Sequence, residues 1–278
     1  MKTLLEKIRE KTNARIKKGT FSKVLIAIGV VLIVFSSYRL ISFYSEDSAA
    51  RNEYIQLREI FSAVIIPPTQ TILPDTDSPR PPESYVPERP NFASLQGAEV
   101  MTDPMEKLIE INPDFVGWIR IDSVIDYPIV RGDDNKRYLN TTFQGKRNSS
   151  GAIFLDYRNS ASFDDEVSII YGHNMRGGSM FRPLHQLQNP EFLAEHQYIA
   201  IVTSDWRILI YRIFAVRVID SWESENNPEQ LTVASIHEAP ENAEQILILS
   251  TCTTGANAAE RLRVYAAKID YVPAQMMQ

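Results

Sequence analysis

The chain has 278 residues, of which 44% are hydrophobic and 23% charged, and its net charge is −6 at neutral pH. This length allows one domain with a substantial core together with additional segments. A single cysteine, Cys252, excludes an intramolecular disulfide, so the core must supply the stability. The acidic balance argues against a nucleic-acid partner.

The chain starts with a basic segment, residues 1–23, in which eight lysines and arginines stand against two glutamates. An uncharged run, Val24–Tyr38, follows, and the apolar pattern continues past Arg39. A helix over residues 24–44 would be long enough to cross a hydrocarbon core of about 30 Å. We therefore expect a single-pass anchor in the cell membrane, with the N-terminus in the cytoplasm and the acidic body outside the cell.

Two other interpretations of this run stay open. A cleaved signal peptide is the first, and the absence of a small-x-small site directly after the apolar run disfavours it, although Ser48–Ala50 leaves cleavage possible. A buried helix of a soluble protein is the second. We prefer the uncleaved anchor.

Residues 45–99 differ in composition from what precedes and follows them. Apolar residues recur at helical spacing from Tyr54 to Val64 and predict a short juxtamembrane helix. Eight of the 16 prolines then fall between Pro67 and Pro90. Proline at this density excludes helix and central strand, so we expect a semi-rigid spacer that holds the body away from the membrane.

The body, residues 100–278, has the length of one domain. Asp103 before a proline predicts a short helix that ends near Ile111, and Asn227–Glu238 predicts a second helix for the same reason. Eight short strands are expected at Val116–Ile121, Tyr127–Val130, Gly151–Leu155, Val167–His173, Tyr198–Thr203, Trp206–Ile219, Ile246–Ser250 and Glu260–Val272. Short strands with few helices indicate a mostly β fold, a closed or nearly closed β-barrel with short peripheral helices.

Three of these strands deliver one reactive side chain each. Cys252 follows a buried strand, His173 ends an earlier strand before a Gly-rich turn, and Arg261 lies near the start of the last strand. A free thiol with a pKa of about 8.5 is mostly protonated at neutral pH, so a nucleophilic cysteine needs a base or a nearby positive charge. An imidazole moves protons and a guanidinium stabilises an oxyanion. The set predicts acyl transfer at a carbonyl.

Structural interpretations stand beside these functional ones. A lone cysteine at a strand end is more often a small buried hydrophobe than a nucleophile, and only its conjunction with His173 favours a site. We assign His185 to packing of a one-turn helix, His196 to a polar linker and His237 to the predicted second helix. No pair of histidine or cysteine residues has ligand spacing, so we expect neither a metal nor another cofactor.

Three motifs resemble those of class B sortases. Tyr171–Phe181 is similar to the histidine segment of that family, and Arg261–Ala266 resembles its arginine strand. Leu249–Cys252 matches most of the Thr-Leu-x-Thr-Cys signature, with Ile248 in place of the first threonine. Similar stretches elsewhere extend the resemblance over almost the whole body, from about residue 105 to residue 269.

The resemblance implies a membrane-anchored cysteine transpeptidase of a Gram-positive surface, with the eight-stranded sortase barrel. Such enzymes cleave a C-terminal sorting signal of an exported protein and hold the acyl group as a cysteine thioester. They then pass it to an amine of a peptidoglycan precursor or of a pilin. Transferred to this sequence, Cys252 is the nucleophile, His173 the general acid/base, and Arg261 the group that holds the substrate and the oxyanion.

Three neighbours of these residues are candidates for substrate binding: Ser250, Thr251 and Asn174. Hydroxyl groups beside a cysteine are equally common as strand-end caps, and Asn174 could instead orient the imidazole. The sorting signal and the amine acceptor stay open. Two other functions also stay open, a cysteine peptidase that releases its product to water and an anchored, non-enzymatic barrel that binds surface partners.

Arg261 and Arg263 lie two residues apart and therefore point to the same face of their strand. Arg261 has the family's spacing, so we expect Arg261→Ala to abolish turnover of a sorting-signal peptide. Arg263→Ala should retain turnover, because Arg263 is assigned a supporting role. Steady-state peptide cleavage by the two variants separates the alternatives, and loss of activity in Arg263→Ala alone would reverse the assignment.

Overall fold

The computed structural model describes residues 2–62, 103–220, 228–253 and 260–269. The chain divides into two compact units, Met1–Ser48 and Ala49–Gln278. The proline-rich part of the predicted spacer lies outside the described residues. The expected anchor and the expected juxtamembrane helix belong to one continuous helix, α1 (Lys2–Phe61).

In the part of the chain that the structure describes, no helix is both long and apolar enough to span a membrane.

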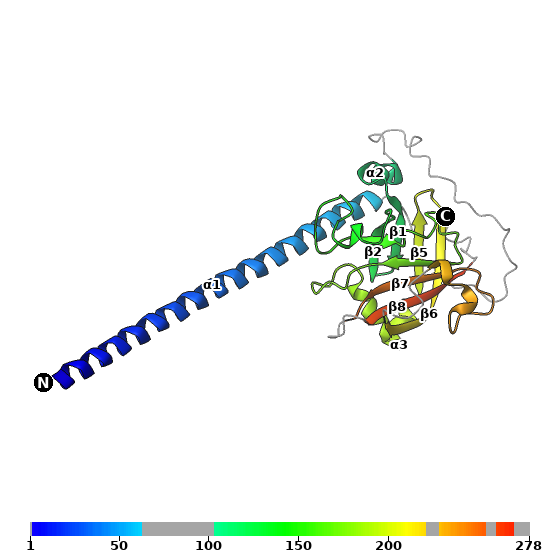
Figure 1. Ribbon diagram of the computed structural model, residues 1–278. Coiled ribbons are helices and arrows are strands. Elements are labelled where there is room, and N and C mark those ends of the chain that lie inside the picture. The colour runs from blue at the N-terminus through cyan, green and yellow to red at the C-terminus, as the bar shows by residue number, and fades with distance from the viewer. Residues whose placement is uncertain (1, 63–102, 221–227, 254–259, 270–278) are drawn as a thin grey trace. The chain divides into compact units, whose positions relative to one another are not determined.

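The second unit is a closed barrel of eight strands, as the sequence predicts (Figure 1). Their order around the barrel is β1-β2-β3-β4-β7-β8-β6-β5, and β1 pairs with β5 to close it. The strands are β1 (Phe115–Ile121), β2 (Ile125–Val130), β3 (Ile153–Leu155), β4 (Val167–Tyr171), β5 (Tyr198–Thr203), β6 (Ile208–Asp220), β7 (Ile246–Cys252) and β8 (Glu260–Ile269).

The pairing directions of three strands determine where the reactive residues lie. Strands β4 and β7 run parallel, with Tyr171 opposite Ser250, so both strands end at the same rim of the barrel. Strand β8 runs antiparallel to β7, so its first residues lie at that rim too. The register places Arg261 directly opposite Cys252.

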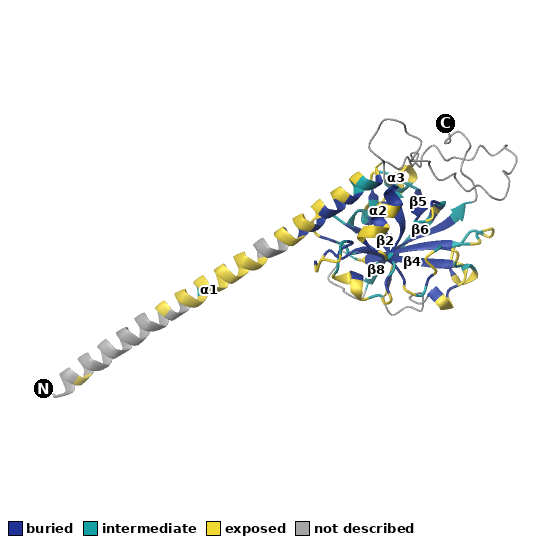
Figure 2. Cartoon of the chain, turned by 90° about the horizontal axis from the view of Figure 1, so that it is seen from above, coloured by how far each residue is buried: buried dark blue, intermediate teal, exposed yellow. Residues whose placement is uncertain are grey.

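Most of the barrel strands are buried (Figure 2). Both faces of β7 are buried, which explains its unbroken apolar run. Leu247 and Leu249 point into the main core. Ile246 and Ile248 point the other way, into a second cluster that Leu231 and its neighbours cover. The strand ends where burial ends, at the exposed Cys252.

The final turns of α1, from Ala49, pack on the barrel through apolar and polar contacts. Phe61 stacks on Trp118 with ring centroids 4.2 Å apart and an interplanar angle of 5°. The buried Glu53 carboxylate accepts hydrogen bonds from the Thr142 hydroxyl at 3.0 Å and the Gln144 amide at 2.9 Å. The end of α1, which we predicted to lie outside the body, thus contributes to the core of the barrel.

The peripheral helices agree only in part with the sequence. Helix α2 (Pro104–Ile111) is confirmed, and the Asp103 carboxylate caps it by accepting from the Met105 amide at 2.8 Å. The predicted helix over Asn227–Glu238 is wrong: its described residues form two short 3-10 turns, η6 (Pro228–Gln230) and η7 (Val233–Ser235). Thr232 separates the two turns, because its backbone is extended and it forms a capping box with Ser235. The remaining short elements are η3 (Arg137–Leu139), η4 (Arg182–Gln188) and α3 (Pro190–Glu195).

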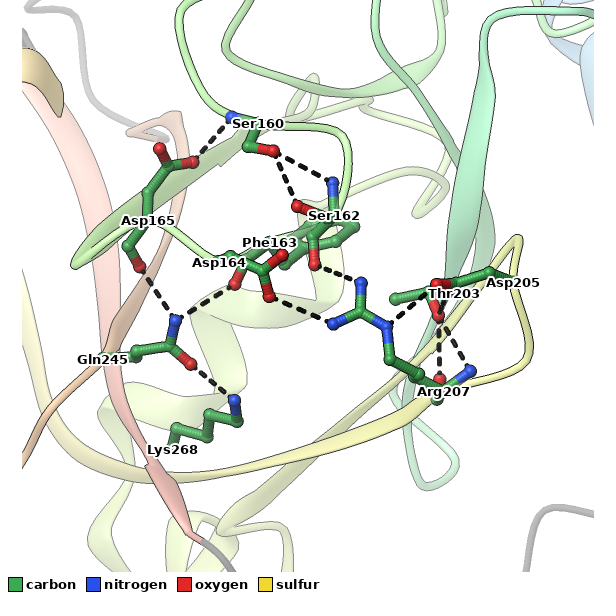
Figure 3. Close-up of polar contacts among 10 residues, drawn as sticks. All are labelled: Ser160, Ser162, Phe163, Asp164, Asp165, Thr203, Asp205, Arg207, Gln245 and Lys268. Atoms are coloured by element: carbon green, nitrogen blue, oxygen red, sulfur yellow. Dashed lines mark hydrogen bonds and ion pairs between the residues drawn. The ribbon is translucent and has the colours of Figure 1, made fainter. Parts of the chain in front are cut away.

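A polar network lies at the end of β7 remote from Cys252, around Gln245 (Figure 3). The Arg207 guanidinium donates to the Ser162 carbonyl at 2.7 Å and forms ion pairs with Asp164 and Asp205, each at 3.0 Å. Gln245, just before β7, donates to the Asp165 carbonyl at 3.3 Å. The network joins the β3–β4 loop to the β5–β6 turn and to the start of β7.

Replacement of Arg207 by methionine, which keeps the aliphatic stem but no charge, should lower the free energy of unfolding by about 1–3 kcal/mol, because several charge-assisted hydrogen bonds are lost. Urea unfolding followed by circular dichroism measures this. Arg212→Met is the matched control on β6: Arg212 is exposed and bonds only to Gln197 among the contacts described for it, so its loss should cost less. Equal costs for the two variants would show that the network does not stabilise the barrel.

Candidate functional site

Three strand ends meet at one rim of the barrel and bring together the residues predicted to react. Cys252 is the last residue of β7 and is exposed. Arg261 faces it across the β7–β8 ladder, and directly opposite residues of an antiparallel pair have their side chains on the same side. His173 follows β4 by two residues, at the rim where β4 and β7 both end.

The chain reaches His173 through a glycine that has no room for a side chain. A Cβ atom on Gly172 would lie 2.6 Å from the ring of Phe181 and 2.5 Å from the Ile153 side chain. The His173 carbonyl in turn accepts from the Phe181 amide at 2.9 Å. Because Gly172 has no Cβ atom, the Phe181 ring can approach it closely, and the histidine segment packs against the barrel.

The contacts of His173 define its tautomer. Nε2 lies 2.7 Å from the carbonyl oxygen of Leu139, the last residue of η3. A carbonyl only accepts hydrogen bonds, so Nε2 must carry the proton. In the neutral imidazole, Nδ1 then holds the lone pair. This is the atom that can take a proton from a thiol.

The two arginines of β8 have different environments. Arg263 is completely buried, opposite Ser250 of β7 and Arg217 of β6. Arg261 is only partly buried, lies level with Cys252, and donates from Nη1 to the Glu260 carbonyl at 2.9 Å. A substrate at the thiol is therefore nearer to the strand position of Arg261. This supports its assignment, which stays a prediction.

The candidate substrate-binding residues occupy unlike positions. Ser250 and Thr251 are each only 3% exposed. Asn174 is half-buried and donates from Nδ2 to the carbonyl oxygen of Cys252 at 2.9 Å. Asn174 is thus the one of the three whose side chain contacts the cysteine backbone.

One residue of the site was missed by sequence reasoning. His185, which we assigned to packing, places its Nε2 3.0 Å from the carbonyl oxygen of Cys252. Burial lowers the pKa of His185, and the positive charge of Arg182 lowers it further, while the hydrogen bond to the Cys252 carbonyl acts in the opposite direction. These two residues are 67 positions apart, so no local pattern could have connected them.

An ion pair with a buried carboxylate lies next to β4, the strand that leads to His173. Asp156 is completely buried, and its carboxylate accepts from Arg158 Nη2 at 2.7 Å and from the Tyr171 hydroxyl at 3.0 Å. Burial raises the pKa of Tyr171, and the Asp156 carboxylate raises it further. Tyr171 therefore stays protonated and donates, which fixes the end of β4 two residues before His173.

The described residues contain no group of three or more His, Cys, Asp or Glu side chains that could hold a metal ion. The chemistry available at the rim is that of a thiol, an imidazole and a guanidinium. A thiol can attack a carbonyl when an imidazole takes its proton, and a guanidinium can stabilise the resulting oxyanion. The arrangement is therefore suited to acyl transfer.

Comparison with known proteins points to one protein family. The Sortase domain family matches residues 119–269 of the chain. Sortase B of Listeria monocytogenes is 32% identical over 167 residues, which are 55% of this chain and 68% of that protein. A Streptococcus pyogenes class B sortase is 30% identical in a structural alignment with a TM-score of 0.53, covering 59% of this chain and 97% of the other. Sortase B of B. anthracis is 25% identical with a TM-score of 0.57, covering 81% of this chain and 99% of the other.

The family match spans all eight strands in part or whole and includes the cysteine, the histidine and both arginines. The closed eight-stranded barrel agrees with it. On this evidence the chain belongs to the sortase family, as a class B sortase and thus a cysteine transpeptidase.

Proposed function

We propose that this enzyme cleaves the C-terminal sorting signal of exported proteins and transfers the new carboxyl end to an amine of the cell surface. The main observation in support is the exposed thiol of Cys252 at the rim. It lies opposite Arg261 and next to the end of β4, the strand that leads to His173. The Streptococcus pyogenes relative is described as involved in pilus biogenesis. Both a peptidoglycan precursor and a pilin are therefore acceptors to be tested.

The first half of the reaction is acylation. Nδ1 of His173 takes the thiol proton of Cys252, and the sulfur attacks the carbonyl carbon of the scissile peptide bond. Arg261 stabilises the negative charge on the carbonyl oxygen. When the C–N bond breaks, His173 returns the proton to the departing amine. A thioester remains on the cysteine, and the C-terminal fragment leaves.

The second half reverses these steps with a different amine. The incoming amine attacks the thioester carbon, and His173 accepts the proton that the nitrogen loses. The C–S bond breaks and the sulfur recovers a proton, so the enzyme returns to its starting state. A bound amine competes with water because its effective concentration near the thioester is high. If water were the acceptor instead, the enzyme would act as a peptidase.

We further propose that the enzyme works at the outer face of the cell membrane, held there by residues 24–44. The support is in the sequence: an uncharged run, Val24–Tyr38, follows a strongly basic segment. Basic residues favour the cytoplasmic side, so the barrel would lie outside the cell. Exported proteins and cell-wall amines are found on that side.

Acylation can be seen directly by intact-mass spectrometry of the full-length chain in detergent. After incubation with peptides that carry Asn-Pro-x-Thr or Leu-Pro-x-Thr-Gly signals, wild type should gain the mass of the N-terminal peptide fragment. Cys252→Ala should gain nothing, because it has no sulfur to acylate. Added diaminopimelate or triglycine should convert the adduct to a ligated peptide.

Hydrolysed product in place of ligated product, with every amine tried, would instead identify a peptidase. Absence of any adduct, together with slow alkylation of the thiol by iodoacetamide, would reject the enzymatic function and favour a binding barrel. Cys252→Ser is a useful companion variant, since its hydroxyl nearly matches the thiol in size and leaves the fold unchanged.

The anchor is tested by fractionation of cells that produce the full chain or a chain starting at Ser45. The full chain should remain in membranes washed with alkaline carbonate, because a spanning helix resists that treatment, and the shorter chain should be released. Protease added to intact protoplasts should digest the barrel if it is outside. Recovery of the full chain in the carbonate wash would contradict the anchor.

A further inference from the structure

The backbone carbonyl of Cys252 is held by two side chains. Asn174 donates to its oxygen from Nδ2 at 2.9 Å, and the Nε2 of His185 lies 3.0 Å from the same oxygen. A carbonyl oxygen has two lone pairs, so these two bonds saturate it. The nucleophilic residue itself is therefore the point on which both side chains converge.

These two side chains bond to the Cys252 carbonyl at a position beyond the end of β4. The last backbone bond that joins the histidine strand to β7 runs from the Gly172 amide to the Ser250 carbonyl, at 3.2 Å. The Cys252 carbonyl lies two residues further along β7 and thus faces the same neighbour. Strand β4 stops at Tyr171, so no β4 residue continues the ladder there. Asn174 and His185 supply the missing donors.

The donors are themselves oriented by one short element, η4 (Arg182–Gln188). Arg182 donates from Nη1 to Oδ1 of Asn174 at 3.1 Å, which turns the amide nitrogen of Asn174 toward Cys252. Gln188 Nε2 lies 3.3 Å from Nδ1 of His185. We call Asn174, Arg182, His185 and Gln188 the carbonyl clamp.

The clamp specifies a neutral His185. Its Nε2 faces a carbonyl and must therefore donate, while Nδ1 faces the amide nitrogen of Gln188 and accepts. Burial and the charge of Arg182 favour the same uncharged form by lowering the pKa of His185. The imidazole acts here as a fixed hydrogen-bond donor and not as a second general base.

We propose that His185 is a positioning residue for acyl transfer: together with Asn174 it fixes the Cys252 backbone and so directs the thiol. This inference rests on the proposed function, because it concerns the acylation step. The physical reason is that Cys252 is the last residue of β7 and is exposed. Without the clamp, only the ladder to β8 would hold it, on one side. A small misplacement of a nucleophile has a large effect on rate.

The test compares three variants of the full-length enzyme. His185→Leu removes the donor, His185→Gln keeps an N–H near the position of Nε2, and Gln186→Leu is a matched control on an exposed neighbour in the same element. We expect the rate of Cys252 acylation to fall about ten-fold in His185→Leu, with KM little changed. His185→Gln should recover most of the rate, and Gln186→Leu should match wild type.

A second readout needs no substrate. Because the chain has one cysteine, labelling with [1-13C]cysteine gives a single carbonyl resonance, that of Cys252. Loss of a hydrogen bond should move this resonance upfield in His185→Leu, whereas His185→Gln should keep it near the wild-type position. Should His185→Leu fail to fold, His185→Asn, whose side chain is too short to reach, replaces it in both measurements.

The outcomes separate the two proposals. Acylation in wild type, with His185→Leu as fast as wild type and an unmoved carbonyl resonance, would overturn the clamp and leave the enzyme's function intact. A loss of rate that His185→Gln does not recover would also overturn it. If wild type itself does not acylate, the proposed function fails, and the carbonyl resonance still decides whether His185 binds Cys252.

Discussion

The parallel pairing of β4 with β7 is the constraint on which the site depends. Parallel strands end on the same side of a sheet, so this pairing places His173 and Cys252 at one rim. The two segments are far apart in the sequence: Asn174, next to His173, is 78 positions from Cys252. The antiparallel β8 then returns Arg261 to the same rim. A shift of β8 by one residue would turn the arginine to the other face, because successive side chains of a strand alternate.

The fold holds β7 firmly at one end and leaves the other end for chemistry. Around Gln245 the polar network of Arg207 joins the loops that surround the start of β7 (Figure 3). Along its length, apolar contacts bury both faces of the strand. At Cys252 these contacts cease, and polar side chains take their place. The exposed Cys252 therefore ends a well-buried strand but is itself held mainly by hydrogen bonds.

Several polar residues near the rim support the backbone of the strands that end there. Next to β4, the buried Asp156 carboxylate is bound by the partly buried Arg158 and Tyr171, and these hydrogen bonds make the burial of its charge tolerable. His185 and Asn174 instead reach the backbone of Cys252. The thiol of Cys252 is exposed and Arg261 is partly buried.

The sequence by itself determined the barrel, its strands and the three candidate residues, because alternating or continuous apolar runs and polar strand ends are local patterns. Only the tertiary structure decided the rest. The described part of the predicted second helix is not helical throughout, because the backbone of Thr232 is extended. The burial of Arg263 and the contact between His185 and Cys252 depend on strand register and on the path of η4. Contacts between distant residues leave no trace in local spacing, which is why only the fold revealed them.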